Sequence, residues 1–290
     1  MRSEQEILDL ILDTARGDRR IRAVILNGSR ANPNAPRDPF QDFDIVYLVT
    51  DIEPFRHNFE WIKRFGELMI LQLPEDMQDP PPDPNDRFAY LMQFTDGNRI
   101  DLGIVPLEKS AEVIGDSLTV VLLDKDRRLA GTAASKDSDY FPHPPTAKAF
   151  ADCCNEFWWV CPYVAKGLWR GEIIYAMHCL ENYAREQLMK MVTWYAGTRT
   201  GFSKNLGKNG KYLQQELEPE IWASLLSTYS DADYGHTWQA LFAACDLFRK
   251  TAVQVAEIFS FDYPNGDDQR VSAYLEHIQH LPADAKEIFP

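Results

Sequence analysis

The first half of the chain alternates short apolar runs with polar segments rich in turn-forming residues. Short runs with many β-branched and aromatic residues predict strands. Residues 4–15 carry apolar side chains at helical spacing and predict an amphipathic helix, and residues 55–65 show the same spacing. Asp96-Gly97, between two of the runs, is typical of a hairpin turn. The predicted strands are residues 21–28, 43–50, 68–73, 88–95, 99–107 and 119–124.

The strand pattern stops there, and the second half of the chain has the pattern of helices. Residues 125–148 are charged, small and proline-rich, which predicts a linker. From about residue 149 to 260, apolar positions recur at helical spacing over long stretches. Glycine often follows the last turn of a helix, so we expect helices to end near Gly171, Gly197 and Gly201.

Length and composition indicate two domains. The chain has 290 residues, against a prior of about 150 residues per domain. Hydrophobic residues make up 45% and charged residues 26%, so the chain can build real cores. We predict an α+β fold, in which an N-terminal domain (residues 1–140) with a mixed β-sheet and flanking helices precedes an all-α helical-bundle domain (residues 141–290).

Charge and cysteine content exclude several classes of protein. The formal net charge of −14 argues against a nucleic-acid binder and favours a cationic partner. The alternative is that the acidic charge only aids solubility. Five cysteines without a CxxC pair indicate free thiols rather than a disulfide framework or structural zinc site. Without a signal-like start or an apolar run of about 18 residues, we expect a cytoplasmic protein with no membrane partner, a monomer or weak dimer.

Acidic residues gather where two of the predicted strands begin. Asp42 and Asp44 flank Phe43, and strand residues two apart face the same side, so the carboxylates converge while Phe43 faces the core. Their repulsion is offset if a cation lies between them, and all-oxygen ligation suits Mg²⁺. Asp101, at the start of another strand, is a natural third carboxylate. The three aspartates are therefore the candidate metal ligands and catalytic residues.

A glycine–serine pair precedes the acidic residues. Gly28 allows the backbone to approach a phosphate closely, and Ser29 offers a hydroxyl and an amide N–H. The pair is not a Walker A loop, because no GKS/T follows. Each piece alone is common in proteins without a site. The ordered set of strand, GSR, loop, DFD and strand, followed by a strand-borne aspartate, is far more specific.

This order resembles the nucleotidyltransferase superfamily that includes the DNA polymerase β-like enzymes. The helical half resembles the aminoglycoside 6-adenylyltransferases, also called streptomycin adenylyltransferases, and the resemblance covers nearly the whole chain. The segments that carry it are NEFWWVCPYVAKGLWRGEIIYAMHCLE (155–181), GKNGKYL (207–213), YSDADY (229–234) and FDYPNGDDQRVSAYLEHIQHLP (261–282).

The resemblance implies transfer of AMP from ATP to a hydroxyl of an aminoglycoside, at position 6 of streptomycin, with release of pyrophosphate and resistance to the antibiotic. It implies Mg²⁺ as cofactor, ATP as co-substrate, and Gly28 and Ser29 at the nucleotide phosphates. The stretch between GS and DFD is a proline-rich insert, which lines the nucleotide site through Arg30 or Arg37 or else lies in solvent.

The helical half is expected to bind the acceptor. Residues 156–170, taken as a helix, put a carboxylate, aromatic rings and basic groups on one face, a mixture unusual for a core. Lys166 on this face is a candidate triphosphate contact, unless it and Arg170 only cover an aromatic cluster with their aliphatic stems. Carboxylates suit the amine and guanidinium groups of a cationic sugar. The candidate acceptor-binding residues are Glu156, Trp159, Tyr163, Glu181 and Asp231.

Two questions stay open at the level of sequence. The general base is Asp101 or a glutamate of the helical half. The alternatives to streptomycin are a different acceptor (another aminoglycoside, a nucleotide or a protein) and a non-catalytic relic that binds nucleotide. Three carboxylates that repel one another argue against a relic, because a relic has no use for them.

Overall fold

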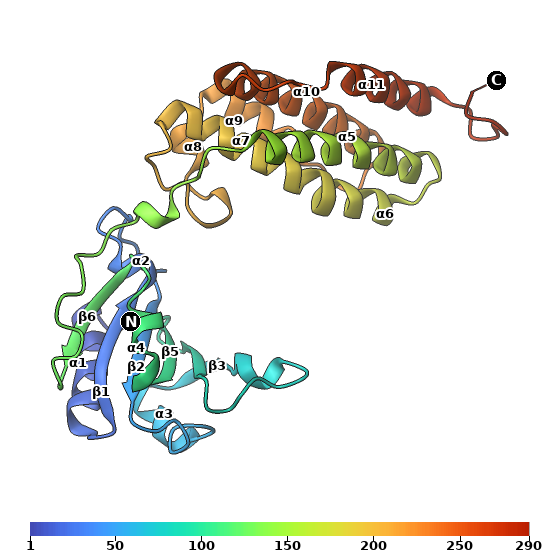
Figure 1. The fold of residues 1–290 in the computed structure, drawn as a ribbon. Helices are drawn as coiled ribbons and strands as arrows, with labels where there is room; N and C mark the ends of the chain where they lie inside the picture. The colour runs from blue at the N-terminus through green and yellow to red at the C-terminus, as the bar shows by residue number, and fades with distance from the viewer. Residues whose placement is uncertain (290) are drawn as a thin grey trace. The chain divides into compact units, whose positions relative to one another are not determined.

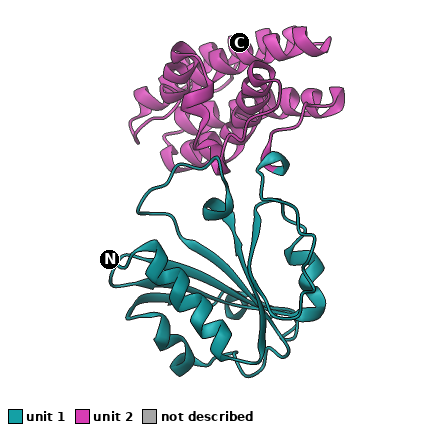
Figure 2. Cartoon of the chain, turned by 90° about the vertical axis from the view of Figure 1, so that its left-hand side faces the viewer, with its two compact units in different colours: residues 1–139 teal, residues 140–290 magenta. Residues whose placement is uncertain are grey.

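The chain forms two compact units, Met1–Asp139 and Tyr140–Pro290 (Figure 2). The structure is a computed structural model, and it describes residues 1–289. Each unit has its own hydrophobic core and is described by itself. No helix within the described residues is both long and apolar enough to cross a membrane.

The first unit is built on a six-stranded mixed sheet with the strand order β3-β4-β5-β2-β1-β6. Strands β2 and β5 run parallel, and the other neighbouring strands of this sheet are antiparallel. Every strand predicted from the apolar runs is present, and the α+β fold class is confirmed. The strands are β1 (Ile21–Asn27), β2 (Phe43–Val49), β3 (Leu68–Gln72), β4 (Phe88–Phe94), β5 (Arg99–Pro106) and β6 (Thr119–Asp124).

Helix α1 (Glu4–Gly17) is the helix predicted at the N-terminus (Figure 1). Its apolar stripe, which includes Ile7 and Ile11, joins the larger core of the sheet together with Phe43 and Tyr47. The Tyr47 hydroxyl donates a hydrogen bond of 2.7 Å to the carbonyl of Ile11, which ties α1 to β2. The alternation along β2 therefore turns its odd-numbered residues toward α1, and Asp44 toward the other face.

The helix predicted over residues 55–65 is only partly present. The structure has the short helix α3 (Phe59–Ile62) followed by a 3₁₀ turn (Lys63–Phe65). His57 has a φ of 52°, in the left-handed region, so the chain cannot continue a right-handed helix through it. The other short α-helices of this unit are α2 (Gly28–Ala31) and α4 (Ser110–Val113).

The second unit is all-helical, and Figure 1 shows α5, α7, α10 and α11 running alongside one another. The stacked rings of Phe157 and Phe248, with centroids 3.9 Å apart, lie in its core. The five cysteines are free thiols, as the sequence indicated, and all five are buried. The helices are α5 (Ala147–Trp169), α6 (Ile173–His178), α7 (Arg185–Thr200), α8 (Leu213–Glu216), α9 (Pro219–Leu226), α10 (Tyr234–Phe259) and α11 (Asn265–His280), and a π-helical turn (Cys179–Ala184) joins α6 to α7.

Two details of the helical unit differ from prediction. Gly197 lies inside α7, which ends at Gly201 with a φ of 62°. A Cβ on Gly197 would lie 2.3 Å from the ring of Phe202, so this glycine makes room for an aromatic side chain instead of ending the helix. Helix α11 lies beyond residue 260, where the predicted helices stopped, and the buried carboxylate of Asp268 on this helix pairs with Arg249 of α10.

Candidate active site

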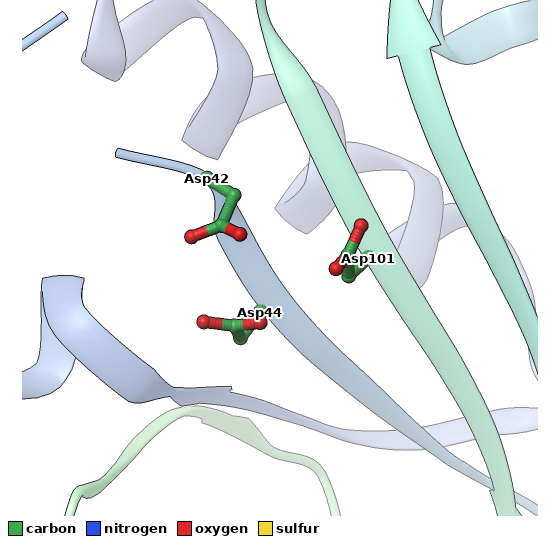
Figure 3. A group of neighbouring side chains, drawn as sticks. All are labelled: Asp42, Asp44 and Asp101. Atoms are coloured by element: carbon green, nitrogen blue, oxygen red, sulfur yellow. The ribbon is translucent and has the colours of Figure 1, made fainter. Parts of the chain in front are cut away.

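Three carboxylates meet where β2 and β5 begin (Figure 3). The parallel register sets Asp44 opposite Asp101, and Asp42 lies two residues before Asp44 on the same chain. One carboxylate oxygen from each residue lies within 4.8 Å of the other two, and all three residues are half-buried. The structure thus brings together the three residues that the sequence suggested as metal ligands.

Gly28 closes the site from the side of β1. Asn27, at the end of β1, pairs with Asp44, and Gly28 follows with a φ of +68°. A Cβ at Gly28 would lie 2.0 Å from Oδ2 of Asp44. The sequence suggested a glycine that admits a phosphate. In the structure, the group that lies close to Gly28 is the Asp44 carboxylate. This position needs glycine because a side chain would clash with that carboxylate and because the φ is positive.

Arg30 has a different environment from the one expected at the nucleotide phosphates. Its guanidinium donates hydrogen bonds to the backbone carbonyls of Gln41 (2.8 Å) and Asp42 (3.0 Å) and pairs with Glu4 at 2.9 Å. The same group lies over the ring of Phe43, 3.8 Å from its centroid. Arg30 is buried, so it holds the end of the proline-rich insert in place and thereby positions the backbone of Asp42.

Sequence reasoning missed a basic residue at the triad. Arg99 donates two hydrogen bonds to Asp101, from Nε (2.8 Å) and from Nη2 (2.7 Å), and its Nε lies 3.9 Å from Oδ2 of Asp42. The bond to Asp101 and the charges of Asp101, Asp42 and Asp44 raise the pKa of the guanidinium. The signal was available, because residues 99 and 101 are two apart on one strand and share a face.

The donor set fits a hard divalent cation. Mg²⁺ prefers carboxylate and water oxygens and is commonly held by one or two protein carboxylates together with substrate phosphates. Asp42, Asp44 and Asp101 offer oxygens close enough to share one ion, and none of the three is a sulfur or imidazole ligand that would favour zinc. These residues would therefore hold the metal implied by the sequence.

Two candidate acceptor residues on α5, Trp159 and Tyr163, form a chain of contacts with Lys166. The indole Nε1 of Trp159 donates a 2.8 Å hydrogen bond to the hydroxyl of Tyr163. The ammonium of Lys166 lies 5.0 Å from the ring centroid of Tyr163 and 5.7 Å from that of Tyr175, within cation–π range. The side chain of Trp159 is 62% exposed, whereas tryptophan side chains are on average largely buried.

Trp159 and Tyr163 also line a cavity of about 390 Å³ within the second unit. Asp267 and Arg270 of α11 lie on its other side, and they pair with each other. The volume is within the usual range for a small-molecule pocket. Asp267 was not among the candidates from sequence, although it lies in the segment 261–282 that carried the family resemblance.

The candidate carboxylates of the helical unit have separate environments. Glu181, in the π-helical turn, accepts two hydrogen bonds from the buried Arg185 (3.0 and 2.8 Å). Asp231 is exposed and pairs with His236 at 2.9 Å, and that contact raises the pKa of the imidazole. Glu156 is exposed on α5. Within the described residues, no hydrogen bond or ion pair joins these three carboxylates to one another.

Comparison with known proteins defines the family. The family model described as streptomycin adenylyltransferase matches residues 1–278. Aminoglycoside 6-adenylyltransferases of Bacillus subtilis and Campylobacter jejuni are 42% and 43% identical to the chain, over 96% and 95% of its length and 98% and 95% of theirs. The crystal structure of an aminoglycoside 6-adenyltransferase from B. subtilis covers 97% of this chain and 100% of its own, with 39% identity and a TM-score of 0.48.

These matches make the chain an enzyme of the nucleotidyltransferase class. More narrowly, it belongs to the streptomycin adenylyltransferase family, whose model spans nearly all of its residues. The resemblance read from the GSR, DFD and helical segments is confirmed.

Proposed function

We propose that this enzyme transfers AMP from ATP to a hydroxyl group of an aminoglycoside, at position 6 of streptomycin, and thereby confers resistance to the antibiotic in the cytoplasm. The match of residues 1–278 to the family model carries the proposal, and the curated relatives bear the name aminoglycoside 6-adenylyltransferase. The convergence of Asp42, Asp44 and Asp101 supports the interpretation that this protein is catalytically active. A relic would gain nothing from keeping three like charges together.

In this proposal, the first unit binds ATP and the metal. The acceptor oxygen forms a bond to the α-phosphorus, and the bond from that phosphorus to the oxygen bridging to the β-phosphate breaks, so pyrophosphate leaves. A bound Mg²⁺ at Asp42, Asp44 and Asp101 would neutralise phosphate charge and lower the pKa of the attacking hydroxyl. The proton of that hydroxyl passes to a carboxylate base, for which Asp101 and a glutamate of the second unit are the candidates.

The nucleotide contacts come from the start of α2 and from α5. Gly28 and Ser29 lie directly after β1, beside Asp44, where backbone N–H groups suit phosphate oxygens. Lys166 is the proposed contact of the second unit with the triphosphate, because its charge balances phosphate charge and, within residues 1–289, its ammonium lies over the faces of two tyrosine rings without an ion pair.

The second unit is proposed to bind the acceptor through aromatic rings and carboxylates. Trp159 and Tyr163 line a cavity of suitable size for a sugar ring. Carboxylates such as Glu181 pair with guanidinium and amine groups through charge-assisted hydrogen bonds, which combine affinity with selectivity. The overall charge of −14 raises the local concentration of a cationic substrate.

One assay separates the alternatives. Pyrophosphate release from ATP is measured with streptomycin and with a panel of other aminoglycosides, nucleotides and proteins as acceptors. The proposal expects release that depends on streptomycin and on Mg²⁺, with AMP found on the sugar by mass spectrometry. If pyrophosphate is released only with another acceptor, adenylyl transfer stands and the proposed acceptor is wrong. If no acceptor gives release, the chain is a non-catalytic relic.

Neutral variants of the acceptor carboxylates test the sugar site. Each of Glu156→Gln, Glu181→Gln and Asp231→Asn removes one negative charge. A buried charge-assisted contact contributes about 1.5–3 kcal/mol, so losing a true ligand should raise the KM for streptomycin roughly 10- to 150-fold. The KM for ATP should change by less than about twofold, and the ratio of the two changes is the measured quantity.

The matched control for this series is Asp152→Asn, which neutralises an exposed carboxylate on α5 that pairs with Lys148 at the surface. Its effect should stay within about twofold for both substrates. If all three test variants behave like this control, the three carboxylates are surface charges and the sugar site lies elsewhere in the second unit.

A further inference from the structure

A cation of the chain itself already lies at the acidic triad. Arg99 binds Asp101 through two parallel hydrogen bonds of 2.8 and 2.7 Å and lies 3.9 Å from Asp42. Two parallel N–H···O bonds to a carboxylate are the strongest form of this pairing. The guanidinium therefore offsets part of the repulsion among the three carboxylates.

The same position sets Arg99 against a divalent cation. A metal ion held by oxygens of Asp42, Asp44 and Asp101 would lie within a few ångströms of a fixed positive charge, and like charges at such separations repel strongly where water is partly excluded. Arg99 also donates a hydrogen bond to each oxygen of Asp101, so whichever of the two such an ion used already accepts from the guanidinium. Arginine and metal therefore compete for one carboxylate.

The side chain of Arg99 is less confined than that of Arg30. Its side chain is 45% exposed, and within residues 1–289 its Nη1 has no hydrogen-bond partner. Arg30, in contrast, has a side chain only 7% exposed, with partners at Glu4 and at two backbone carbonyls. The nucleotide brings phosphate oxygens, which an arginine fork pairs with as well as it does with a carboxylate.

We infer that Arg99 couples metal loading to nucleotide binding: it occupies Asp101 in the free enzyme and moves to the nucleotide phosphates when metal and ATP bind together. This inference rests on the proposed nucleotidyl transfer at the triad and deepens it. It makes Arg99 a substrate-contacting residue that free divalent metal must displace. The free enzyme then binds metal weakly, and MgATP binds well because it supplies both the ion and a new partner for Arg99.

A different role for Arg99 would have the opposite effect on metal binding. An arginine that only orients Asp101 raises the affinity for a metal, since the ligand is held in place. An arginine that competes with the metal lowers it. The sign of the change on removal of Arg99 therefore separates the two roles, and it is measured without turnover.

The experiment compares wild type with Arg99→Gln and Arg99→Lys in the full chain. Binding of Mn²⁺ alone is followed by electron paramagnetic resonance, and binding of a non-hydrolysable ATP analogue in the presence of Mg²⁺ is followed by calorimetry. For Arg99→Gln we expect about tenfold tighter Mn²⁺ binding and about tenfold weaker analogue binding. Arg99→Lys keeps the charge but lacks the fork, so Mn²⁺ affinity should stay near wild type while analogue binding falls.

Two controls make the outcome decisive. Arg22→Gln removes another arginine that pairs in the same two-bonded manner, with Asp126, and it should change neither affinity. Asp101→Asn tests the metal site itself and should abolish Mn²⁺ binding. If Asp101→Asn abolishes Mn²⁺ binding but Arg99→Gln binds Mn²⁺ no more tightly than wild type, the coupling role of Arg99 is overturned and the proposed metal site stands. Unchanged Mn²⁺ binding by Asp101→Asn would overturn both the proposed metal site and the coupling.

Discussion

Replacing Asp44 or Asp42 by asparagine is expected to abolish nucleotidyl transfer while the fold stays intact. Asparagine has the same shape as aspartate but lacks the charge that a divalent cation requires. A metal supplies several kcal/mol of transition-state stabilisation, so its loss corresponds to a fall in kcat of about a thousandfold or more. Pyrophosphate release gives the rate, and thermal unfolding monitored by circular dichroism reports whether the fold is unchanged.

The control for these variants is Asp38→Asn. Asp38 lies in the proline-rich insert that precedes Asp42 and is exposed, and its carboxylate accepts a hydrogen bond from the backbone of Phe40. Its activity should stay within about twofold of wild type. Near-normal turnover in either the Asp42 or the Asp44 variant would exclude the triad as the metal site.

Gly28→Ala should inactivate the enzyme through Asp44. The added Cβ would lie 2.0 Å from Oδ2 of Asp44, so the carboxylate must leave its position in the triad. A non-glycine residue at a φ of +68° also strains the backbone, which costs about 1–2 kcal/mol. We expect at least a hundredfold loss of kcat, because a displaced metal ligand costs far more activity than stability.

Gly97→Ala separates strain from displacement. Gly97 has a φ of +87° in the β4–β5 hairpin, and nothing lies within 4 Å of the Cβ that it would carry. It should lose about the 1–2 kcal/mol of stability that backbone strain alone costs, measured by chemical denaturation, and keep its activity. If Gly28→Ala keeps full activity, as Gly97→Ala is expected to, then glycine at position 28 is not required to place the Asp44 carboxylate for catalysis.

The sheet and its triad were predictable because both depend on a period of two. Apolar runs marked every strand, and the same alternation turned Phe43 toward the core and Asp42 and Asp44 to the opposite side. Asp101 was predictable as a strand-borne carboxylate, but its place opposite Asp44 depends on the parallel pairing of β2 with β5, which joins residues far apart in sequence.

The partners of the arginines were not predictable in the same way. A long, flexible side chain reaches groups that the fold brings near, and sequence spacing does not identify them. Arg30 is a candidate phosphate contact from its place beside Gly28 and Ser29, but that place did not indicate its pairing with Glu4 or with the backbone carbonyl of Asp42. Gly197 was expected to end a helix, but it makes room for Phe202, a contact that only the packed structure defines.

The order of the strands along the chain bears on how the protein folds during its synthesis. All six strands lie between residues 21 and 124, and the first helix of the second unit begins at Ala147. The sheet and triad can therefore form on the ribosome before that unit is made, as N-terminal domains generally do. We expect arrested nascent chains that expose residues 1–140 to resist protease, and the free fragment to bind Mn²⁺ without transferring AMP to an aminoglycoside. Protease sensitivity until the full chain is released would instead mean that the helical unit is required for the sheet to form.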